Sequence, residues 1–113
     1  MKIFITGVAG FLGSHLADLM ISEGHTVAGN DNMIGGYMDN VPQNVEFHQV
    51  DCCDLENMTK AMEGCDIVYH TAATAYEGLS VFSPVLVTRN IFEASVTTIT
   101  AAIRNKVKRI VYC

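Results

Sequence analysis

Basic residues are scarce in this sequence, and none occurs between Lys2 and Lys60. The 113 residues contain 7 Lys and Arg against 12 Asp and Glu, which gives a formal net charge of −5 at pH 7. The one basic cluster, from Arg104 to Arg109, fits the carboxyl end of a helix, where cations offset the helix dipole. The lack of a large basic patch therefore argues against nucleic acid and anionic membrane surfaces as partners.

Long apolar runs are also missing. No segment approaches the ~20 consecutive apolar residues that span a bilayer. Met1 and Lys2 lead directly into a short apolar stretch and a glycine, unlike a secretory leader. We therefore expect a cytoplasmic protein, and its length predicts a single domain over residues 1–113.

The spacing of cysteines and histidines does not match a metal site. Adjacent cysteines do not readily bridge each other, and without a secretory context the thiols are expected to be reduced. The residues concerned are Cys52, Cys53, Cys65, Cys113, His15, His25, His48 and His70.

Three glycines near the amino terminus are the most informative positive feature. Gly7, Gly10 and Gly13 follow the short apolar segment 2–5 and open a helical stretch. At such a junction the first glycine permits a sharp turn, the second lets the backbone approach an anion, and the third lets the helix pack closely. Amide groups at the helix start, aided by the helix dipole, would point at a phosphate. The spacing G-x-x-G-x-x-G predicts a nucleotide site only in a suitable context, because such patterns also arise by chance.

Asp31 provides that context. It stands at the end of a second apolar segment, 26–30, and lies 18 residues after Gly13. An acid about 20 residues beyond the glycines accepts hydrogen bonds from a ribose 2′-hydroxyl and repels a 2′-phosphate. With no nearby cation to pair with that phosphate, NAD is favoured over NADP. The alternative is an ordinary loop aspartate.

Apolar segments alternate with helical ones, which predicts an α/β fold with helices on both faces of a parallel sheet. Strands are expected at 2–5, 26–30, 45–50, 66–70 and 108–113, and helices at 10–23, 55–63 and 84–105. Asp54 and Ser83 are the predicted N-caps, and residues 32–44 are expected to form an irregular, mobile loop. Because the last strand would leave a sheet edge and face uncovered, we expect the N-terminal part of a larger protein, or a chain that needs a partner.

The first helix has an apolar stripe. Its members are Phe11, Leu12, Leu16, Leu19 and Met20, and Gly24 is the predicted stop.

In this order and spacing, the motifs resemble the N-terminal part of an extended short-chain dehydrogenase/reductase of the NAD-dependent epimerase/dehydratase family, whose members act on nucleotide sugars. The resemblance covers essentially the whole chain. The matching segments are 6–15, Asp31-Asn32, Asp51, 70–73 and 107–112. It implies a Rossmann-type doubly wound parallel sheet of about five strands in the order 3-2-1-4-5, truncated after strand five.

The resemblance also implies roles for individual residues. The glycine turn, together with Phe11 and Leu12, would hold the pyrophosphate of NAD. Asp31 and Asn32 would hold the adenosine ribose. Asp51 and Cys52 would lie at the adenine ring. The segment Thr71, Ala72 and Ala73 would lie against the cofactor towards its nicotinamide end. Alternatively, Asp51 simply ends a strand or caps a turn, and the Ala72-Ala73 pair reflects tight packing. We interpret His70 as a hydrogen-bonded strand-end residue and not as a proton carrier.

Two departures from the family pattern stand out. An asparagine common in the helix after strand four aligns with Ile91, one residue from Asn90, and Ala94-Ser95 replaces the usual Gly-Thr. Many relatives also have a large apolar residue where Thr71 stands.

The catalytic Tyr-x-x-x-Lys of the family does not occur in this sequence, so no catalytic residue is assigned. Tyr37, Tyr69 and Tyr76 are followed at that distance by Val41, Ala73 and Ser80, and Tyr112 by no residue. The family's strand-five serine would fall just beyond Cys113.

The resulting hypothesis is the NAD-binding portion of a nucleotide-sugar epimerase or dehydratase that transiently oxidises a sugar hydroxyl. The resemblance further implies a homodimer that pairs through the helix 84–105. The alternative is a non-catalytic NAD-binding sensor or scaffold module. A P-loop nucleotidase is excluded because no Gly-Lys-Ser/Thr follows the glycines, and a methyltransferase is disfavoured by the segments 70–73 and 107–112.

Overall fold

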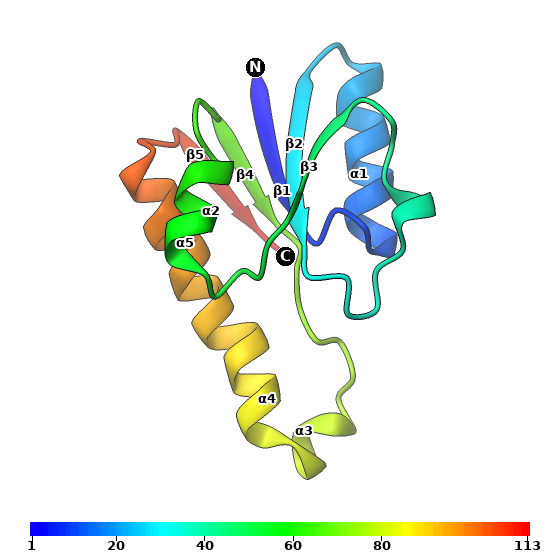
Figure 1. Cartoon of the computed structure of the whole chain (residues 1–113), viewed down its shortest axis with the longest axis vertical. Coiled ribbons are helices and arrows are strands. Elements are labelled where there is room, and N and C mark those ends of the chain that lie inside the picture. Colours follow the sequence, from blue (N-terminus) through cyan, green and yellow to red (C-terminus); the bar gives the residue numbers. More distant parts are fainter.

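The computed structural model describes all 113 residues and is built around one parallel sheet (Figure 1). Its five strands lie in the order β3-β2-β1-β4-β5, and every neighbouring pair is parallel. The bounds are β1 Lys2–Thr6, β2 Thr26–Asp31, β3 Val45–Gln49, β4 Ile67–His70 and β5 Arg109–Tyr112. The predicted fold class and strand order are confirmed.

Helices cover both faces of the sheet (Figure 1). The helix α1, Phe11–Ser22, packs on one face, where Ile3 and Ile5 of β1 point. On the other face, where Phe4 points, lie α2, Leu55–Ala61, and α5, Ala94–Arg104. Because successive side chains of a strand alternate between faces, a nearly continuous apolar run such as β1 fits a strand that is buried on both sides.

The segment after β4 forms the longest helical region. It comprises α3, Leu79–Phe82, then α4, Pro84–Thr88, the π-helical turn η2, Arg89–Glu93, and α5. Pro84 starts α4 as predicted, but the Ser83 side chain makes no capping hydrogen bond. Asp54 does cap α2, since its carboxylate accepts from the Asn57 amide at 3.2 Å. The π turn was not foreseen, because an i→i+5 turn has no residue signature of its own.

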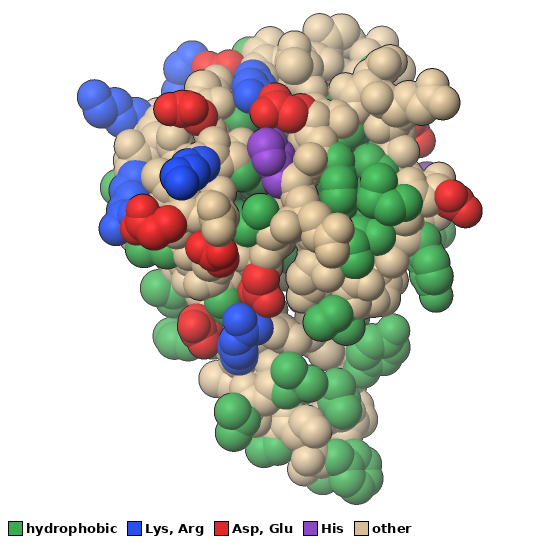
Figure 2. All heavy atoms as spheres, in the orientation of Figure 1, with side chains coloured by type: hydrophobic (Ala, Val, Ile, Leu, Met, Phe, Trp, Pro, Cys, Tyr) green, Lys and Arg blue, Asp and Glu red, His purple; other side chains and the backbone are tan.

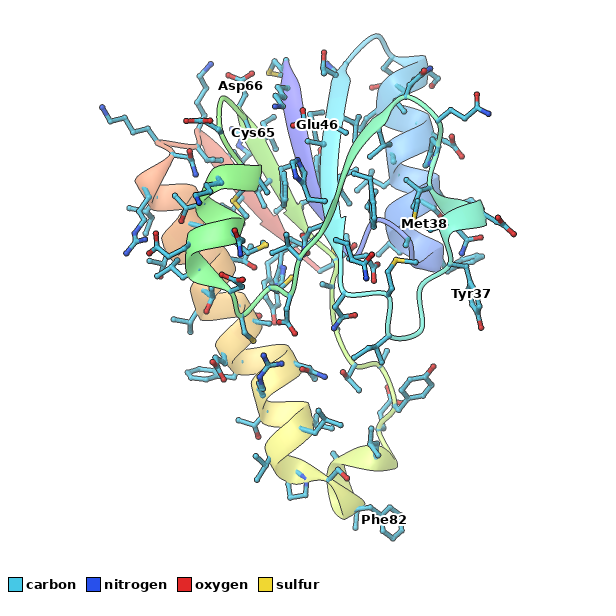
Figure 3. All side chains as sticks on the ribbon, viewed as in Figure 1. Tyr37, Met38, Glu46, Cys65, Asp66 and Phe82 are labelled. Atoms are coloured by element: carbon cyan, nitrogen blue, oxygen red, sulfur yellow. The ribbon has the colours of Figure 1, made fainter.

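Residues 32–44 follow an irregular path with one short 3₁₀ turn, η1, at Met38–Asn40. This segment is tied to the glycine turn, because the Tyr37 amide and the Asn40 side-chain amide both donate to the Ala9 carbonyl. Tyr37 itself projects from the outer side of the molecule (Figure 3). The loop therefore lies beside the amino end of α1.

Only part of the apolar stripe of α1 contacts the sheet. Leu16 and Met20 pack against it, whereas Phe11, Leu12 and Leu19 are exposed. The fully buried positions are the small residues Gly13, Ser14 and Ala17. The helix approaches the strands too closely for larger side chains at those positions.

Further apolar side chains gather at the end of the molecule formed by α3 and α4 (Figure 2). Phe82 projects from the tip of α3 and is 85% exposed (Figure 3). Val85, Phe92, Val96 and Ile103 of the helical region are exposed as well. No helix of this fold is both long enough and apolar enough to cross a membrane.

The close packing of α1 gives a stability prediction. A Cβ at position 13 would overlap the Gly7 carbonyl oxygen and lie 2.9 Å from the Val8 Cα, both backbone atoms that have little room to move. Gly13→Ala should therefore lower the free energy of unfolding by at least about 2 kcal/mol. Gly78→Ala, where a Cβ meets nothing within 4 Å, is the matched control and should change it by less than about 0.5 kcal/mol. Equal urea midpoints for the two variants would refute the close contact.

Candidate functional site

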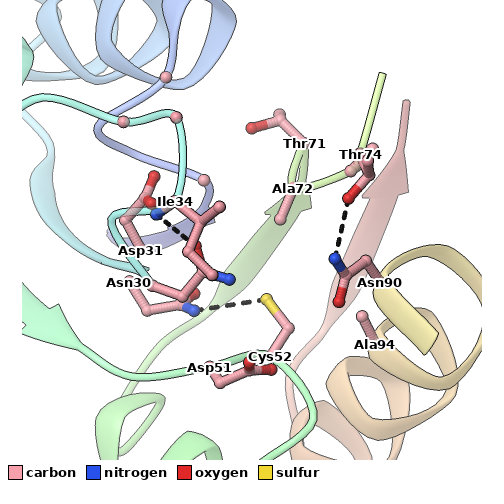
Figure 4. A pocket seen from close by; sticks show the side chains of 16 residues that line it. Asn30, Asp31, Ile34, Asp51, Cys52, Thr71, Ala72, Thr74, Asn90 and Ala94 are labelled. Atoms are coloured by element: carbon pink, nitrogen blue, oxygen red, sulfur yellow. Dashed lines mark hydrogen bonds between the residues drawn. The ribbon is translucent and has the colours of Figure 1, made fainter. Parts of the chain in front are cut away.

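A pocket of about 160 Å³ lies at the carboxyl ends of the strands (Figure 4). Its walls come from the first turn, the end of β2 and the following loop, the end of β3, the segment after β4, and the helical region. The chain passes from β1 to β2 on one side, and from β4 to β5 on the other, so the strand order reverses between β1 and β4. Ligands of open α/β sheets bind at such a switch point.

The glycine turn forms one wall of the pocket. Gly7 has a φ of +71°, and its amide and that of Val8 donate to the Asn30 carbonyl at 2.8 and 3.1 Å. A Cβ on Gly7 would lie 3.0 Å from the Ala72 Cα, so only glycine fits both the conformation and the space. The turn is thereby hydrogen-bonded to β2 and lies close against the segment after β4.

The turn leaves donors free at the start of α1. Gly10 is the N-cap and supplies no side-chain capping bond. The amides of Phe11, Leu12 and Gly13 find no acceptor within the chain, as expected for the first turn of a helix. Three free amides at the positive end of a helix dipole form an anion-binding arrangement.

Asp31 lies directly beside this turn and is held on both sides of its carboxylate. One oxygen accepts from the Ala9 amide at 3.1 Å and the other from the Met33 amide at 2.8 Å. Only 8% of the residue is exposed, and none of the ion pairs in the structure involves it. The arrangement presents an oriented carboxylate without a neutralising cation.

Asp51 and Cys52 follow β3 on the opposite wall (Figure 4). Partial burial raises the pKa of Asp51, but hydrogen bonds from the Cys53 amide and the Arg89 guanidinium outweigh this and hold the pKa below its usual value. Burial raises the pKa of the Cys52 thiol and raises that of Cys53 to about 11. Both thiols are therefore protonated at neutral pH and are poor nucleophiles.

Asn30 is a site residue that sequence reasoning treated only as strand. It is 1% exposed, and its amide nitrogen donates to the Val50 carbonyl at 2.8 Å and to the Cys52 sulfur at 3.3 Å. It thereby fixes the loop after β3 against β2. A polar residue inside an otherwise apolar strand was the available signal.

The segment Thr71–Ala73 is positioned by a hydrogen-bonded chain centred on Thr6. The Thr6 hydroxyl accepts from the amides of Thr71 and Ala72, so its own proton goes to His70 Nδ1 at 2.8 Å. His70 Nε2 then carries the ring proton and donates to the Ser95 hydroxyl at 3.0 Å. The chain ends where Ser95 donates to the Ile91 carbonyl.

This arrangement agrees with reading His70 as a hydrogen-bonded strand-end residue. The ring is 2% exposed, and burial lowers its pKa. The Thr71 hydroxyl donates to the Thr6 carbonyl, so a polar side chain at this position adds a second link between β1 and the pocket wall.

Of the twelve predicted cofactor residues, the pocket brings nine together. They are Gly7, Gly10, Asp31, Asn32, Asp51, Cys52, Thr71, Ala72 and Ala73. Phe11, Leu12 and Gly13 do not line it: Phe11 is 82% exposed with its ring 4.6 Å from that of His15, and Gly13 is buried behind the turn. Asn90, and not Ile91, lines the pocket and donates to the Thr74 hydroxyl at 3.0 Å.

Comparison with known proteins places this geometry in a family. The model of the "NAD dependent epimerase/dehydratase family" matches residues 3–113. The chain belongs to this family. One epimerase/dehydratase relative is the probable UDP-arabinose 4-epimerase 3 of Arabidopsis thaliana, 30% identical over 97% of this chain and 29% of the relative. GDP-mannose 3,5-epimerase of the same plant is 41% identical over 65% of this chain and 19% of the relative.

Solved structures of epimerases superpose closely on the chain. UDP-glucose 4-epimerase of Thermotoga maritima, solved with UDP-glucose, gives a TM-score of 0.96 at 31% identity and covers 99% of this chain and 37% of that one. The UDP-glucose 4-epimerase of Thermus thermophilus, solved as a complex with NAD, gives 0.91 at 32% identity, covering 97% and 36%. The chain thus spans little more than a third of these proteins.

The neutral His70 gives a pH prediction. An unfolded histidine takes up a proton below its ordinary pKa of 6.5, whereas the folded one, with a lowered pKa, does so only at lower pH. The contribution of His70 to stability is therefore complete above pH 6.5 and falls as the pH drops below that value towards the folded pKa. Urea unfolding between pH 7.5 and about 5 should show this slope.

His70→Leu is the matched variant. It should flatten the pH slope and, by leaving the Thr6 and Ser95 hydroxyls without partners, cost about 1–3 kcal/mol at pH 7.5. An unchanged slope would mean that His70 is not the group responsible.

Proposed function

We propose that this chain is the NAD-binding portion of a nucleotide-sugar epimerase or dehydratase, with residues 1–113 forming its NAD-binding domain. The observation that carries the proposal is that three free helix-start amides and an oriented, cation-free carboxylate both lie beside the glycine turn that lines the pocket. The first suits a pyrophosphate and the second a ribose diol. Support also comes from the family description, which is NAD-dependent, and from relatives solved with NAD.

The residues present fit this cofactor. Amides at Phe11, Leu12 and Gly13 would hold the pyrophosphate, and the bare Cα atoms of Gly7 and Gly10 would let it approach. Asp31 and Asn32 would hold the adenosine ribose. The adenine would lie at Asp51 and Cys52, and the nicotinamide end against Thr71, Ala72 and Ala73.

When bound, NAD supplies the hydride acceptor that a transient oxidation of a sugar hydroxyl needs. This chain's own contribution is to bind and orient it. Thr6 and His70 fix the amides of Thr71 and Ala72, so the wall against which the flat ring would pack is rigid. The tyrosine and lysine of the family's chemistry are not among these residues.

The substrate class rests on the relatives. The Thermotoga maritima structure holds UDP-glucose, and the curated relatives are named for UDP-arabinose and GDP-mannose. We propose a nucleotide sugar for this protein on that basis. These relatives are named as enzymes, which gives no support to the alternative of a non-catalytic sensor or scaffold.

Asp31→Asn tests cofactor choice. Loss of the charge should weaken NAD binding by about tenfold to a hundredfold, the usual range for a hydrogen bond to a charged group. The same change removes the repulsion of a 2′-phosphate, so the ratio of NADP to NAD affinity should rise, a shift that simple loss of stability would not produce. Titration calorimetry with both dinucleotides measures the ratio.

Asp39→Asn is the control, because Asp39 is an exposed acid on η1 outside the pocket. It should leave both affinities unchanged. A folded wild-type protein that shows no binding at millimolar NAD would overturn the proposed function itself.

We further propose that the protein is a homodimer that pairs through the exposed apolar side chains of the helical region, Pro84 to Asn105. Phe92 is 68% exposed at its centre, and burial of such side chains is the usual driving force for association. Phe92→Asp should convert a dimer to a monomer in sedimentation equilibrium. Met38→Asp, at an exposed methionine on η1, should leave the mass unchanged, and a wild-type monomer would contradict the proposal.

A further inference from the structure

Three segments around the mouth of the pocket are joined through two adjacent helix residues. Arg89 Nη1 donates to Asp51 Oδ2 at 3.2 Å and to Asn90 Oδ1 at 3.3 Å. Asn90 Nδ2 in turn donates to Thr74 Oγ1 at 3.0 Å (Figure 4). The loop after β3, the turn η2 and the segment after β4 are therefore connected by one continuous chain of polar contacts.

The π turn explains how two neighbouring residues serve the same rim. In an α-helix, with 3.6 residues per turn, successive side chains point in directions about 100° apart. An i→i+5 turn holds more residues, so this angle is smaller. Arg89 and Asn90 are the first two residues of η2, and both reach groups at the pocket mouth. A π turn at this point fits the tendency of such turns to occur at functional sites.

The ion pair also has an electrostatic consequence. Asp31 and Asp51 both line the pocket, which is proposed to take an anionic dinucleotide. Arg89–Asp51 is the one ion pair of the structure that includes a pocket-lining residue. It neutralises the carboxylate at the proposed adenine end and leaves Asp31 as the single uncompensated charge.

Arg89 fixes the geometry of Asp51 as well. One Asp51 oxygen accepts from the Cys53 amide at 2.8 Å, and the other faces Arg89. The Cys53 thiol lies 3.5 Å from the Arg89 carbonyl oxygen, so a second contact joins the same two segments. The orientation of the loop that would touch the adenine thus depends on η2.

We propose that Arg89 is a positioning residue for the cofactor, which holds the loop Asp51–Cys53 against η2 and so sets the width and charge of the adenine end of the pocket. The proposal rests on the proposed function. Arg89 acts through Asp51 and Asn90 and does not itself line the pocket.

Arg89→Gln is the decisive variant, and Arg104→Gln is its matched control. Arg104 Nη1 pairs with Glu56 Oε1 at 3.0 Å, is about as exposed as Arg89 (45% against 43%), and links α5 to α2 away from the pocket. The two changes remove the same charge from the same helical region. Both are made in the gene product that contains this chain.

The readout is the affinity for three probes: NAD, AMP and nicotinamide mononucleotide. Arg89→Gln should weaken the binding of NAD and of AMP by the same factor, about fivefold, as for the loss of an exposed ion pair. It should leave the affinity for nicotinamide mononucleotide unchanged. Arg104→Gln should alter none of the three. An unfolding temperature measured without ligand shows whether the two variants differ in stability.

Each outcome has a separate meaning. A wild-type protein that binds no NAD would overturn the proposed function. If the wild-type protein binds NAD, and Arg89→Gln binds both NAD and AMP as tightly as the wild type does, the role of Arg89 alone would be overturned. If the variant binds AMP and nicotinamide mononucleotide more weakly by the same factor, the pocket is damaged as a whole. That result would also reject the proposal that Arg89 positions the adenine end.

Discussion

The close approach of the first turn to its two neighbouring segments is the constraint on which the site depends. The amides of Gly7 and Val8 are bonded to the Asn30 carbonyl of β2, and a Cβ on Gly7 would lie only 3.0 Å from the Ala72 Cα beyond β4. These contacts set where α1 begins and therefore where its free amides point. A side chain at Gly7 would separate all three segments, so the pocket exists only because the backbone is bare there.

Polar groups inside the core extend this constraint across the sheet. Thr6, His70 and Ser95 come from β1, β4 and α5, and each has its donors and acceptors satisfied by the next. Asn30 ties β2 to the loop after β3 through its amide nitrogen, while its Oδ1 is buried without a partner. Buried polar groups need such partners, since an unpaired one costs about 1–3 kcal/mol. The walls of the pocket are consequently held in fixed relation before any ligand arrives.

Charge is distributed unevenly around the pocket. The glycine turn contributes only backbone dipoles, Asp31 contributes a bare carboxylate, and Asp51 is neutralised by Arg89. A dinucleotide has a matching sequence of groups, with an anionic bridge next to a ribose diol and then a neutral base. The family membership and this order of groups both support the proposal that the chain binds NAD.

Alternating apolar segments predicted the parallel sheet, and the glycine spacing and the strand-end Asp31 predicted a nucleotide site, because these are local signals. Beyond them, the sequence predicted the strand order and the places of Asp51, Cys52 and residues 71–73 only through its resemblance to the family. It did not show which face of α1 is buried, since small residues at Gly13, Ser14 and Ala17 carry no apolar signal and are selected by closeness to the strands. The roles of Asn30, Arg89 and Asn90 follow from the tertiary structure. Their partners lie 16 to 38 residues away in the chain, and the π turn that carries Arg89 and Asn90 has no residue signature of its own.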